Sequence, residues 1–250
     1  MILDKAHHFN SWDVVLASQL PRRAEFLKLT GLTFRIVPSS FEENLDKSTF
    51  SSARDYASEN SKRKAKDVFD SLALKESDFK TNRMVIGSDT VVVLDGTILE
   101  KPKDQKSAVS MLRSLSGRTH TVCTGVTLIF SSTLNNKENS KPFTELTFAE
   151  ETTVTFASLT DSQIDAYVAT GEPMDKAGSY GIQGIGGTFI PKINGCFYNV
   201  AGFPLHKFCQ ELNDIMQILF HYVVLRICTC EEKKVSGSLK KNHHSLFQNG

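Results

Sequence analysis

The feature that most constrains this chain is an apolar run, residues 84–94, that ends at an Asp-Gly pair. Asp95-Gly96 is followed by a second short apolar segment, Thr97–Leu99. An Asp-Gly pair between two such segments is typical of a tight β-hairpin. One acidic residue, Asp89, interrupts the run. The sequence therefore predicts a buried strand that carries a carboxyl group in need of a partner, because an unpaired buried charge costs several kcal/mol.

Strand and helix signals alternate through the rest of the chain. Asp13–Ser18 reads as a short buried strand, and Pro21 then takes the first position of a helix that ends before Gly31. The other predicted elements are strands at 34–37, 119–130, 144–156 and 188–193, a turn at Asn194-Gly195, and helices at 51–74, 104–115 and 160–169. This mixture predicts an α/β fold with a mixed (α+β) sheet, arranged as a single domain with two lobes around a central cleft.

The charge balance limits the partners. Lys and Arg number 29 against 28 Asp and Glu, a formal net charge of +1, so no global positive field favours a nucleic-acid polymer. We expect no signal peptide and no membrane span, and the odd number of cysteines, 5, favours reduced thiols. The chain is therefore expected to be cytoplasmic, and any anionic partner must meet a local cluster of cations.

The end of the chain differs from the rest. Residues 203 to about 228 can form a helix, and residues 213–230 are an apolar extension beyond the main domain at 11–212. Residues 231–250 are polar and are expected to be disordered. The polar stretch 131–141 is expected to be a mobile loop between two strands.

A candidate phosphate site lies at the first strand-to-helix junction. Ser18 ends the strand, and Arg22 and Arg23 begin the helix, so a hydroxyl, backbone N–H groups and two guanidinium groups could face one anion. The alternative is that the two arginines only solvate the first helical turn.

Asp89 could bind a metal or transfer a proton, or it could merely bond to neighbouring backbone. Glu43 is a candidate second acid, although adjacent glutamates in a loop are usually solvated. Lys64, Lys101 and Lys176 could place charges on phosphate or be ordinary surface lysines. The glycine-dense segment 178–187 either lets the backbone approach a ligand or forms a structural turn.

Taken together, several ordered blocks closely resemble the Maf family of nucleotide pyrophosphatases. They are residues 16–23, 41–43, 86–92, 99–102, 115–120, 171–184 and 199–205. The resemblance extends to the Maf-like N-terminal half of the acetylserotonin O-methyltransferase-like proteins, and it implies a Maf/ITPase-like fold. It also implies hydrolysis of a nucleoside triphosphate between the α and β phosphates with Mg²⁺, or Mn²⁺, and suggests a homodimer.

The resemblance also implies roles for particular residues. Asp89 takes the catalytic position and, with Glu43, the metal. The residues implied to bind the phosphates are Ser18, Arg22, Lys64, Lys101 and Lys176.

The dTTP/UTP branch of the family is similar to this chain at the positions of Arg23, Thr90 and Gln183. A glutamine amide can complement O4 and N3-H of uracil or thymine. The chain departs from the family at Gln19 and Leu20, which replace small and hydroxyl residues of the phosphate loop. Two alternatives stay open: a nucleotide-binding regulator with little turnover, and a pyrophosphatase for 7-methylguanosine triphosphate.

Overall fold

The computed structural model describes residues 4–75, 82–131 and 144–217. Residues 3–208 form one compact unit, and residues 209–217 belong to a second. The predicted loop at 132–141, the end of the apolar extension at 218–230 and the predicted tail lie outside the described residues. The expected domain boundary near residue 212 stays a prediction.

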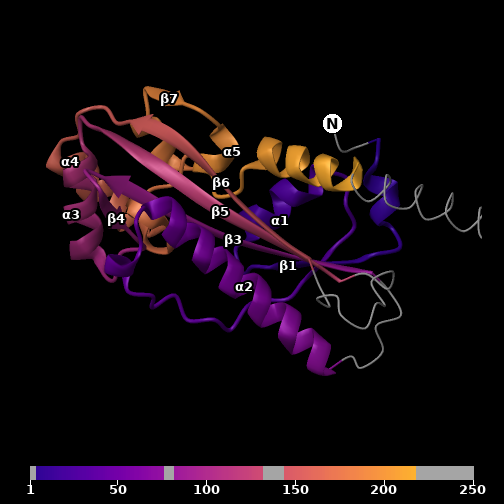
Figure 1. Cartoon of the computed structure of the whole chain (residues 1–250). Coiled ribbons are helices and arrows are strands. Elements are labelled where there is room, and N and C mark those ends of the chain that lie inside the picture. Colours follow the sequence, from indigo (N-terminus) through magenta and orange to yellow (C-terminus); the bar gives the residue numbers. More distant parts are fainter. Residues whose placement is uncertain (1–3, 76–81, 132–143, 218–250) are drawn as a thin grey trace, which may run out of the picture. The chain divides into compact units, whose positions relative to one another are not determined.

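A mixed sheet of seven strands organises the larger unit, in the order β2-β1-β3-β5-β6-β7 with β4 on β3 (Figure 1). The strands are β1 (Asp13–Ala17), β2 (Arg35–Ile36), β3 (Arg83–Leu94), β4 (Thr97–Leu99), β5 (Thr119–Ser131), β6 (Thr144–Thr155) and β7 (Lys192–Asn194). β1 is parallel to β2 and β3, whereas the other pairs are antiparallel. The expected mixed α/β class is confirmed.

The predicted hairpin joins β3 and β4. Asp95 and Gly96 at its tip have positive φ angles of 49° and 77°, the conformation for which Asp-Gly turns are suited. β3 also pairs along nearly its whole length with β5, and this register sets Asp89 opposite Gly125. Asp89 therefore lies in the stretch of β3 between the residues that pair with β1 and those that pair with β4.

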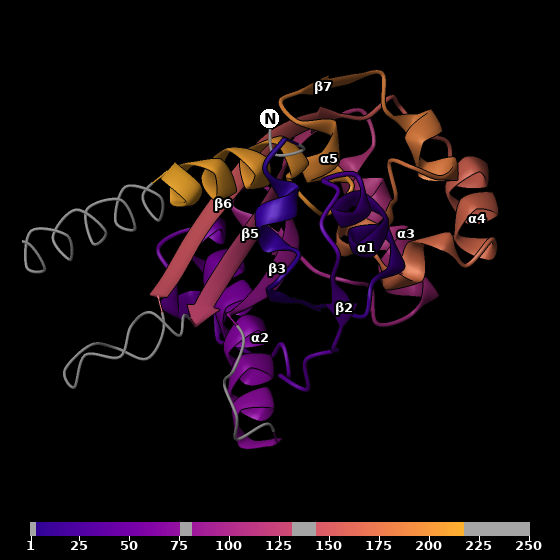
Figure 2. The same cartoon turned by 90° about the vertical axis from the view of Figure 1, so that its right-hand side faces the viewer.

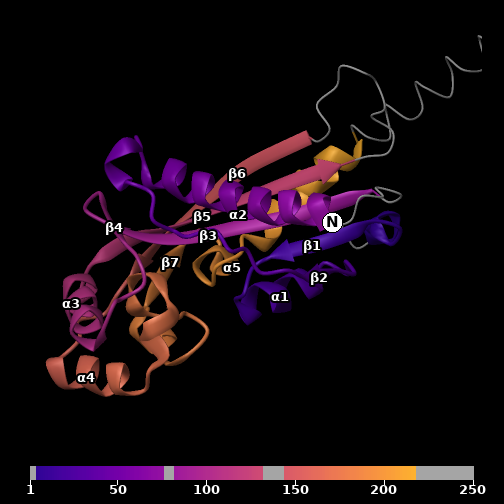
Figure 3. The same cartoon turned by 90° about the horizontal axis from the view of Figure 1, so that it is seen from below.

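The helix α2 (Ala53–Lys75) runs along one face of β3 and β5, while α1 (Pro21–Lys28) and α5 (Phe197–Val200) lie on the other side (Figure 3). Two glycines allow α2 to come close. A Cβ atom on Gly87 would lie 2.2 Å from the Ser61 carbonyl oxygen, and one on Gly125 would lie 2.5 Å from that of Ala57. Ala65, Val68 and Leu72 of α2 complete a buried core with β1 and β3.

A second core lies where β3 and β5 meet α3 (Gln105–Leu115) and α4 (Asp161–Ala169). Figure 2 shows α3 and α4 close together at one end of the sheet. Both helices begin with a capping box: the Asp104 carboxylate accepts from the Ser107 N–H, and the Thr160 hydroxyl accepts from that of Gln163. The predicted helices at 104–115 and 160–169 are thus confirmed by local hydrogen bonds.

The segment after the glycine-dense stretch differs from the expectation. The strand predicted at 188–193 is wrong in its first part, because Ile185–Phe189 forms a 3-10 helix, η6, and β7 begins only at Lys192. The Asn194-Gly195 turn leads into α5 rather than into a further strand. Residues 205–217 are helical, and none of the described helices is long and apolar enough to cross a membrane.

Candidate active site

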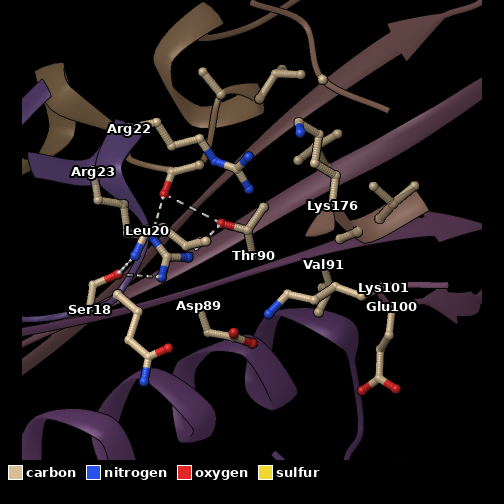
Figure 4. Close-up of a pocket in the computed structure, with 18 of the residues that line it drawn as sticks. Ser18, Leu20, Arg22, Arg23, Asp89, Thr90, Val91, Glu100, Lys101 and Lys176 are labelled. Atoms are coloured by element: carbon tan, nitrogen blue, oxygen red, sulfur yellow. Dashed lines mark hydrogen bonds between the residues drawn. The ribbon is translucent and has the colours of Figure 1, made fainter. Parts of the chain in front are cut away.

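A cavity of about 870 Å³ lies at the carboxyl end of β1, beside the middle of β3. Its wall combines the β1–α1 junction, the loop before α2, the central residues of β3 and the glycine-dense segment. The cavity brings together all of the site residues predicted from the sequence, namely Ser18, Arg22, Arg23, Glu43, Lys64, Asp89, Thr90, Lys101, Lys176 and Gln183. Figure 4 shows Asp89 at this cavity with Arg22, Lys101 and Lys176 around the same opening.

Asp89 lies in β3 with only 7% of its side chain exposed, and its Oδ1 accepts from the Lys64 ammonium at 2.7 Å. Burial alone would raise the pKa of this carboxyl group. The charge and hydrogen bond of Lys64, helped by the charge of Arg23, outweigh burial and hold the Asp89 pKa below its usual range. The acid predicted from the apolar run is therefore paired and ionised.

Glu43 reaches the same lysine from the loop after β2. Its Oε1 lies 2.9 Å from Lys64 Nζ, and its side chain is 41% exposed. The loop is fixed on α2, because the Asp67 carboxylate accepts from the Ser39 hydroxyl and the Ser40 N–H, both at 2.7 Å. Lys64 is thus bracketed by two carboxylates from separate parts of the chain.

Arg23 is buried, whereas an arginine that binds phosphate would be expected to expose its guanidinium to the cavity. Its guanidinium is enclosed: Nε donates to the Gly202 carbonyl at 3.0 Å, Nη1 to Ser18 Oγ at 3.3 Å and Nη2 to Thr90 Oγ1 at 3.3 Å (Figure 4). Burial lowers the pKa of Arg23 to about 10, which leaves it charged at neutral pH. Arg23 therefore joins Ser18, Thr90 and the segment around Gly202 into one network.

The remaining cations, Arg22, Lys101 and Lys176, differ in their exposure and in their hydrogen-bond partners. Arg22 is half-buried, which lowers its pKa, and among the described residues its buried Nε has no hydrogen-bond partner. Lys176 donates to the Glu172 carbonyl at 2.8 Å and to the Asp175 carboxylate at 2.6 Å. Lys101 is exposed at the cavity. An orphaned buried Nε is a donor that an anion could satisfy.

Sequence reasoning missed three residues at the cavity: Glu100, Tyr180 and Glu172. The Glu100 carboxylate accepts from the Tyr56 hydroxyl at 2.6 Å and from Lys47 at 2.7 Å. Burial, together with the Glu100 hydrogen bond, raises the Tyr56 pKa, so this phenol stays protonated. No local pattern could reveal the pair, because 44 positions separate the two residues.

Gln19 and Leu20, the departures noted in the phosphate loop, also line the cavity. The Leu20 N–H is satisfied by Ser18 Oγ at 3.2 Å, so the loop keeps a hydrogen-bonded turn without the second hydroxyl. The effect of these two residues on turnover stays a prediction.

Asp89 and Glu43 are the described residues that could contribute ligands to a magnesium ion at this cavity. The described residues contain no group of three or more His, Cys, Asp or Glu side chains that could hold a metal by themselves. Mg²⁺ commonly binds through one or two carboxylates while phosphates and waters supply the other ligands. Asp89 and Glu43, which share the Lys64 ammonium, supply such a pair of carboxylates.

The fold and the cavity together define a class of protein: an α/β domain that holds an ionised carboxylate beside several cations, as anion-binding enzymes do. The family follows from a direct comparison. A family model described as Maf-like protein matches residues 13–215, and the chain belongs to the Maf family. The family membership expected from the sequence blocks is confirmed.

Curated relatives are similar over most of this chain. A "Nucleoside triphosphate pyrophosphatase" of Dictyostelium discoideum is 46% identical, covering 79% of this chain and 88% of the relative. A "dTTP/UTP pyrophosphatase" of Bacillus pumilus is 43% identical, covering 80% of this chain and 94% of the relative.

A human protein named "Probable bifunctional dTTP/UTP pyrophosphatase/methyltransferase protein" is 46% identical over 80% of this chain, which spans 31% of that relative's length. Among solved structures, a HAM1 protein from Coxiella burnetii aligns with 81% of this chain and 99% of that chain, at 16% identity and a TM-score of 0.41. This last likeness is too distant to carry an argument.

Proposed function

We propose that this chain hydrolyses dTTP and UTP to the nucleoside monophosphate and pyrophosphate. The relatives named dTTP/UTP pyrophosphatase support this activity. The observation that carries it in the structure is the ionised Asp89 carboxylate, which is buried beside Lys64 at a cavity with four further cations. A buried ion pair with a perturbed carboxylate pKa beside further cations in a cavity is an arrangement typical of functional sites.

The reaction is attack of water on the α phosphorus, with cleavage of the bond to the oxygen that bridges the α and β phosphates. In our proposal the Asp89 carboxylate accepts a proton from the attacking water. Lys64 holds that carboxylate ionised and in place until then. Arg22, Lys101 and Lys176 neutralise the charge that develops on the pyrophosphate as it leaves.

A divalent metal completes this proposal. The cavity wall holds five cationic side chains, of Arg22, Arg23, Lys64, Lys101 and Lys176, and five carboxylates, of Glu25, Glu43, Asp89, Glu100 and Glu172. The wall therefore has no net charge with which to balance a triphosphate. We propose Mg²⁺, with Mn²⁺ as the alternative, held by Asp89 and Glu43. When bound, the ion would supply positive charge to the phosphate oxygens.

The nucleobase is proposed to meet Gln183, which lines the cavity on the glycine-dense segment. Its amide carries one acceptor and two donors, which can match O4 and N3-H of uracil or thymine. Thr90 and Arg23 also line the cavity, and the Arg23 guanidinium donates to the Thr90 hydroxyl at 3.3 Å. We therefore propose that Arg23 shapes the site rather than contacting the base. A cytoplasmic location and a homodimer remain part of this proposal on sequence grounds alone.

The test compares pyrophosphate release from dTTP, UTP, CTP and 7-methylguanosine triphosphate with Mg²⁺ for the wild type and Asp89→Asn. We expect dTTP and UTP to be cleaved, and the rate to fall by about 100-fold or more in the variant, the usual effect of removing a general base. Asp161→Asn, at an exposed carboxylate on α4 that pairs with Arg113, is the matched control and should keep the wild-type rate.

Three outcomes would contradict the proposal. A full rate in Asp89→Asn would exclude the role of Asp89. Preference for 7-methylguanosine triphosphate would replace the pyrimidine substrates. If dTTP raises the melting temperature and no triphosphate is cleaved, the protein is a nucleotide-binding regulator.

A further inference from the structure

One carboxylate that the proposed reaction does not use, that of Glu172, holds the glycine-dense segment in place. Glu172 begins the 3-10 helix η4 (Glu172–Asp175) and lines the cavity. Its Oε2 accepts from the Ile185 N–H at 2.9 Å, and its Oε1 accepts from the Gly186 N–H at 3.2 Å. The Tyr167 hydroxyl donates to the same Oε1 at 2.9 Å. Three donors therefore meet on one carboxylate.

The glycines of this segment are explained by that contact. A Cβ atom on Gly184 would lie 2.5 Å from both carboxylate oxygens of Glu172, and one on Gly186 would lie 2.6 Å from the Tyr167 hydroxyl. At either position a Cβ atom would push the Glu172 carboxylate or the Tyr167 hydroxyl out of its place. The glycine density thus lets the backbone approach Glu172 and Tyr167, where the sequence alone left open an approach to a ligand.

Gln183 lies between the two anchored points. On one side the Gly181 N–H donates to the Tyr167 hydroxyl at 3.2 Å, and on the other the Ile185 N–H donates to Glu172. A turn closes between them, since the Gly184 N–H donates to the Gly181 carbonyl at 3.3 Å. The backbone that carries the Gln183 amide is therefore fixed from both ends by the Glu172–Tyr167 pair.

A fixed backbone matters for base recognition. A glutamine amide that can turn over exchanges its acceptor and donor positions, and it then suits cytosine as well as uracil. Discrimination between the two bases requires that the amide be presented in one place and one orientation. The backbone anchors do not set the amide torsion, but they set the place from which the Gln183 amide reaches the base, and this decides whether its two hydrogen bonds to uracil or thymine can form together. Glu172 can thus affect selectivity without touching the base.

We propose that Glu172 is a positioning residue for nucleobase selectivity, acting through the backbone that presents Gln183. This inference rests on the proposed function, in which Gln183 meets a uracil or thymine. Glu172→Gln keeps the shape of the side chain but replaces one acceptor oxygen with an NH₂ donor. That NH₂ would face a backbone or hydroxyl donor, so the segment loses at least one of its anchoring hydrogen bonds.

The experiment measures selectivity, as the ratio of kcat/KM for UTP to that for CTP, in the wild type, Glu172→Gln, Gln183→Ala and the double variant. We expect each single variant to lower the ratio by about tenfold, chiefly through a higher KM for UTP, and the double variant to lower it no further. Glu25→Gln, which removes an exposed carboxylate from the same cavity wall, is the control for charge and should keep the wild-type ratio.

An unchanged ratio in folded Glu172→Gln, or effects that multiply in the double variant, would overturn the inference. If Glu172→Gln does not fold, Tyr167→Phe serves instead, because it removes only the hydroxyl that bonds Glu172 and the Gly181 N–H. Calorimetric dissociation constants for UTP and CTP provide a second readout. A wild type that binds UTP selectively but releases no pyrophosphate would refute the proposed function and still test the role of Glu172.

Discussion

Asp89 and His120 lie on neighbouring strands and are both about 95% or more buried, yet the protein keeps the first charged and the second neutral. Lys64 supplies Asp89 with an opposite charge. Among the described residues, His120 meets no opposite charge: its Nε2 lies 2.7 Å from the Tyr180 hydroxyl, and the rings of Phe156 and Tyr180 pack edge-to-face with its ring. Burial therefore lowers the His120 pKa to about 4. The structure places this histidine in the core, as a packed residue rather than a ligand.

The lowered pKa of His120 makes the stability of the fold depend on pH. Between about pH 6.5 and pH 4 the unfolded chain binds a proton at His120 that the folded protein does not, so stability falls as the pH falls through this range. We expect the free energy of unfolding of His120→Gln, relative to wild type, to rise by about 2–3 kcal/mol between pH 7 and pH 4.5. Urea titrations at the two pH values measure this difference. Exposed His206, changed to Gln, is the control, and an equal gain there would contradict the account.

At the scale of elements, α2 packs on the sheet so closely that Gly87 of β3 leaves no room for a Cβ atom. An added Cβ on Gly87 would meet the Ser61 carbonyl at 2.2 Å and Ala65 at 2.8 Å, so α2 would have to move. Lys64 lies between those two positions, and its ammonium would leave Asp89. We expect Gly87→Ala to lower the free energy of unfolding by about 1–3 kcal/mol, the usual cost of overpacking, and to lower kcat as well.

Thermal unfolding and pyrophosphate release measure the two effects. Gly96→Ala at the hairpin tip is the control, since nothing lies within 4 Å of an added Cβ there. It should cost about 1–2 kcal/mol for its positive φ, with no effect on kcat. A Gly87→Ala variant with wild-type kcat would show that the close approach of α2 does not position Lys64.

The elements show which parts of the structure a sequence can predict. The hairpin at Asp95-Gly96 and the helices at 104–115 and 160–169 could be predicted, because the hydrogen bonds that begin them join residues within four positions. The first part of the strand expected at 188–193 is wrong because Ile185–Phe189 forms a 3-10 helix. The N–H groups of Ile185 and Gly186 in that helix bond Glu172, which lies 13 positions before Ile185. Contacts of that kind depend on tertiary structure, and no local sequence pattern predicts them.

The site divides in the same way. Its charged residues could be named from the sequence blocks, since this chain has the charged residues of the family at the same places within those blocks. Their partners could not be named, such as the hydrogen bonds of Arg23 to Ser18, Thr90 and the Gly202 carbonyl. The expected role of Arg23 at the substrate stays a prediction. The pairing of Asp89 with Lys64 needs the β3–α2 packing, which the glycines permit but do not specify.

At the scale of the whole molecule, neither the chain nor the cavity wall carries a substantial net charge. The chain has a formal net charge of +1, and the wall balances five cations against five carboxylates. Long-range steering of an anionic substrate should therefore be weak, because it depends on a net field that salt can screen. Affinity should come from short contacts and from the metal that accompanies the substrate.

This balance predicts a weak dependence on salt. With saturating Mg²⁺, kcat/KM for UTP should change by less than about threefold between 20 mM and 200 mM NaCl. Glu25→Lys, at an exposed position of the wall, replaces a negative with a positive charge and so raises the net charge of the wall by two. Its kcat/KM should therefore be higher at low salt and should fall more steeply as salt is added. Initial rates over a salt series measure both slopes. A wild-type slope as steep as that of Glu25→Lys would mean that the carboxylates of the wall do not offset its cations, and the argument for a metal from charge balance would then fail.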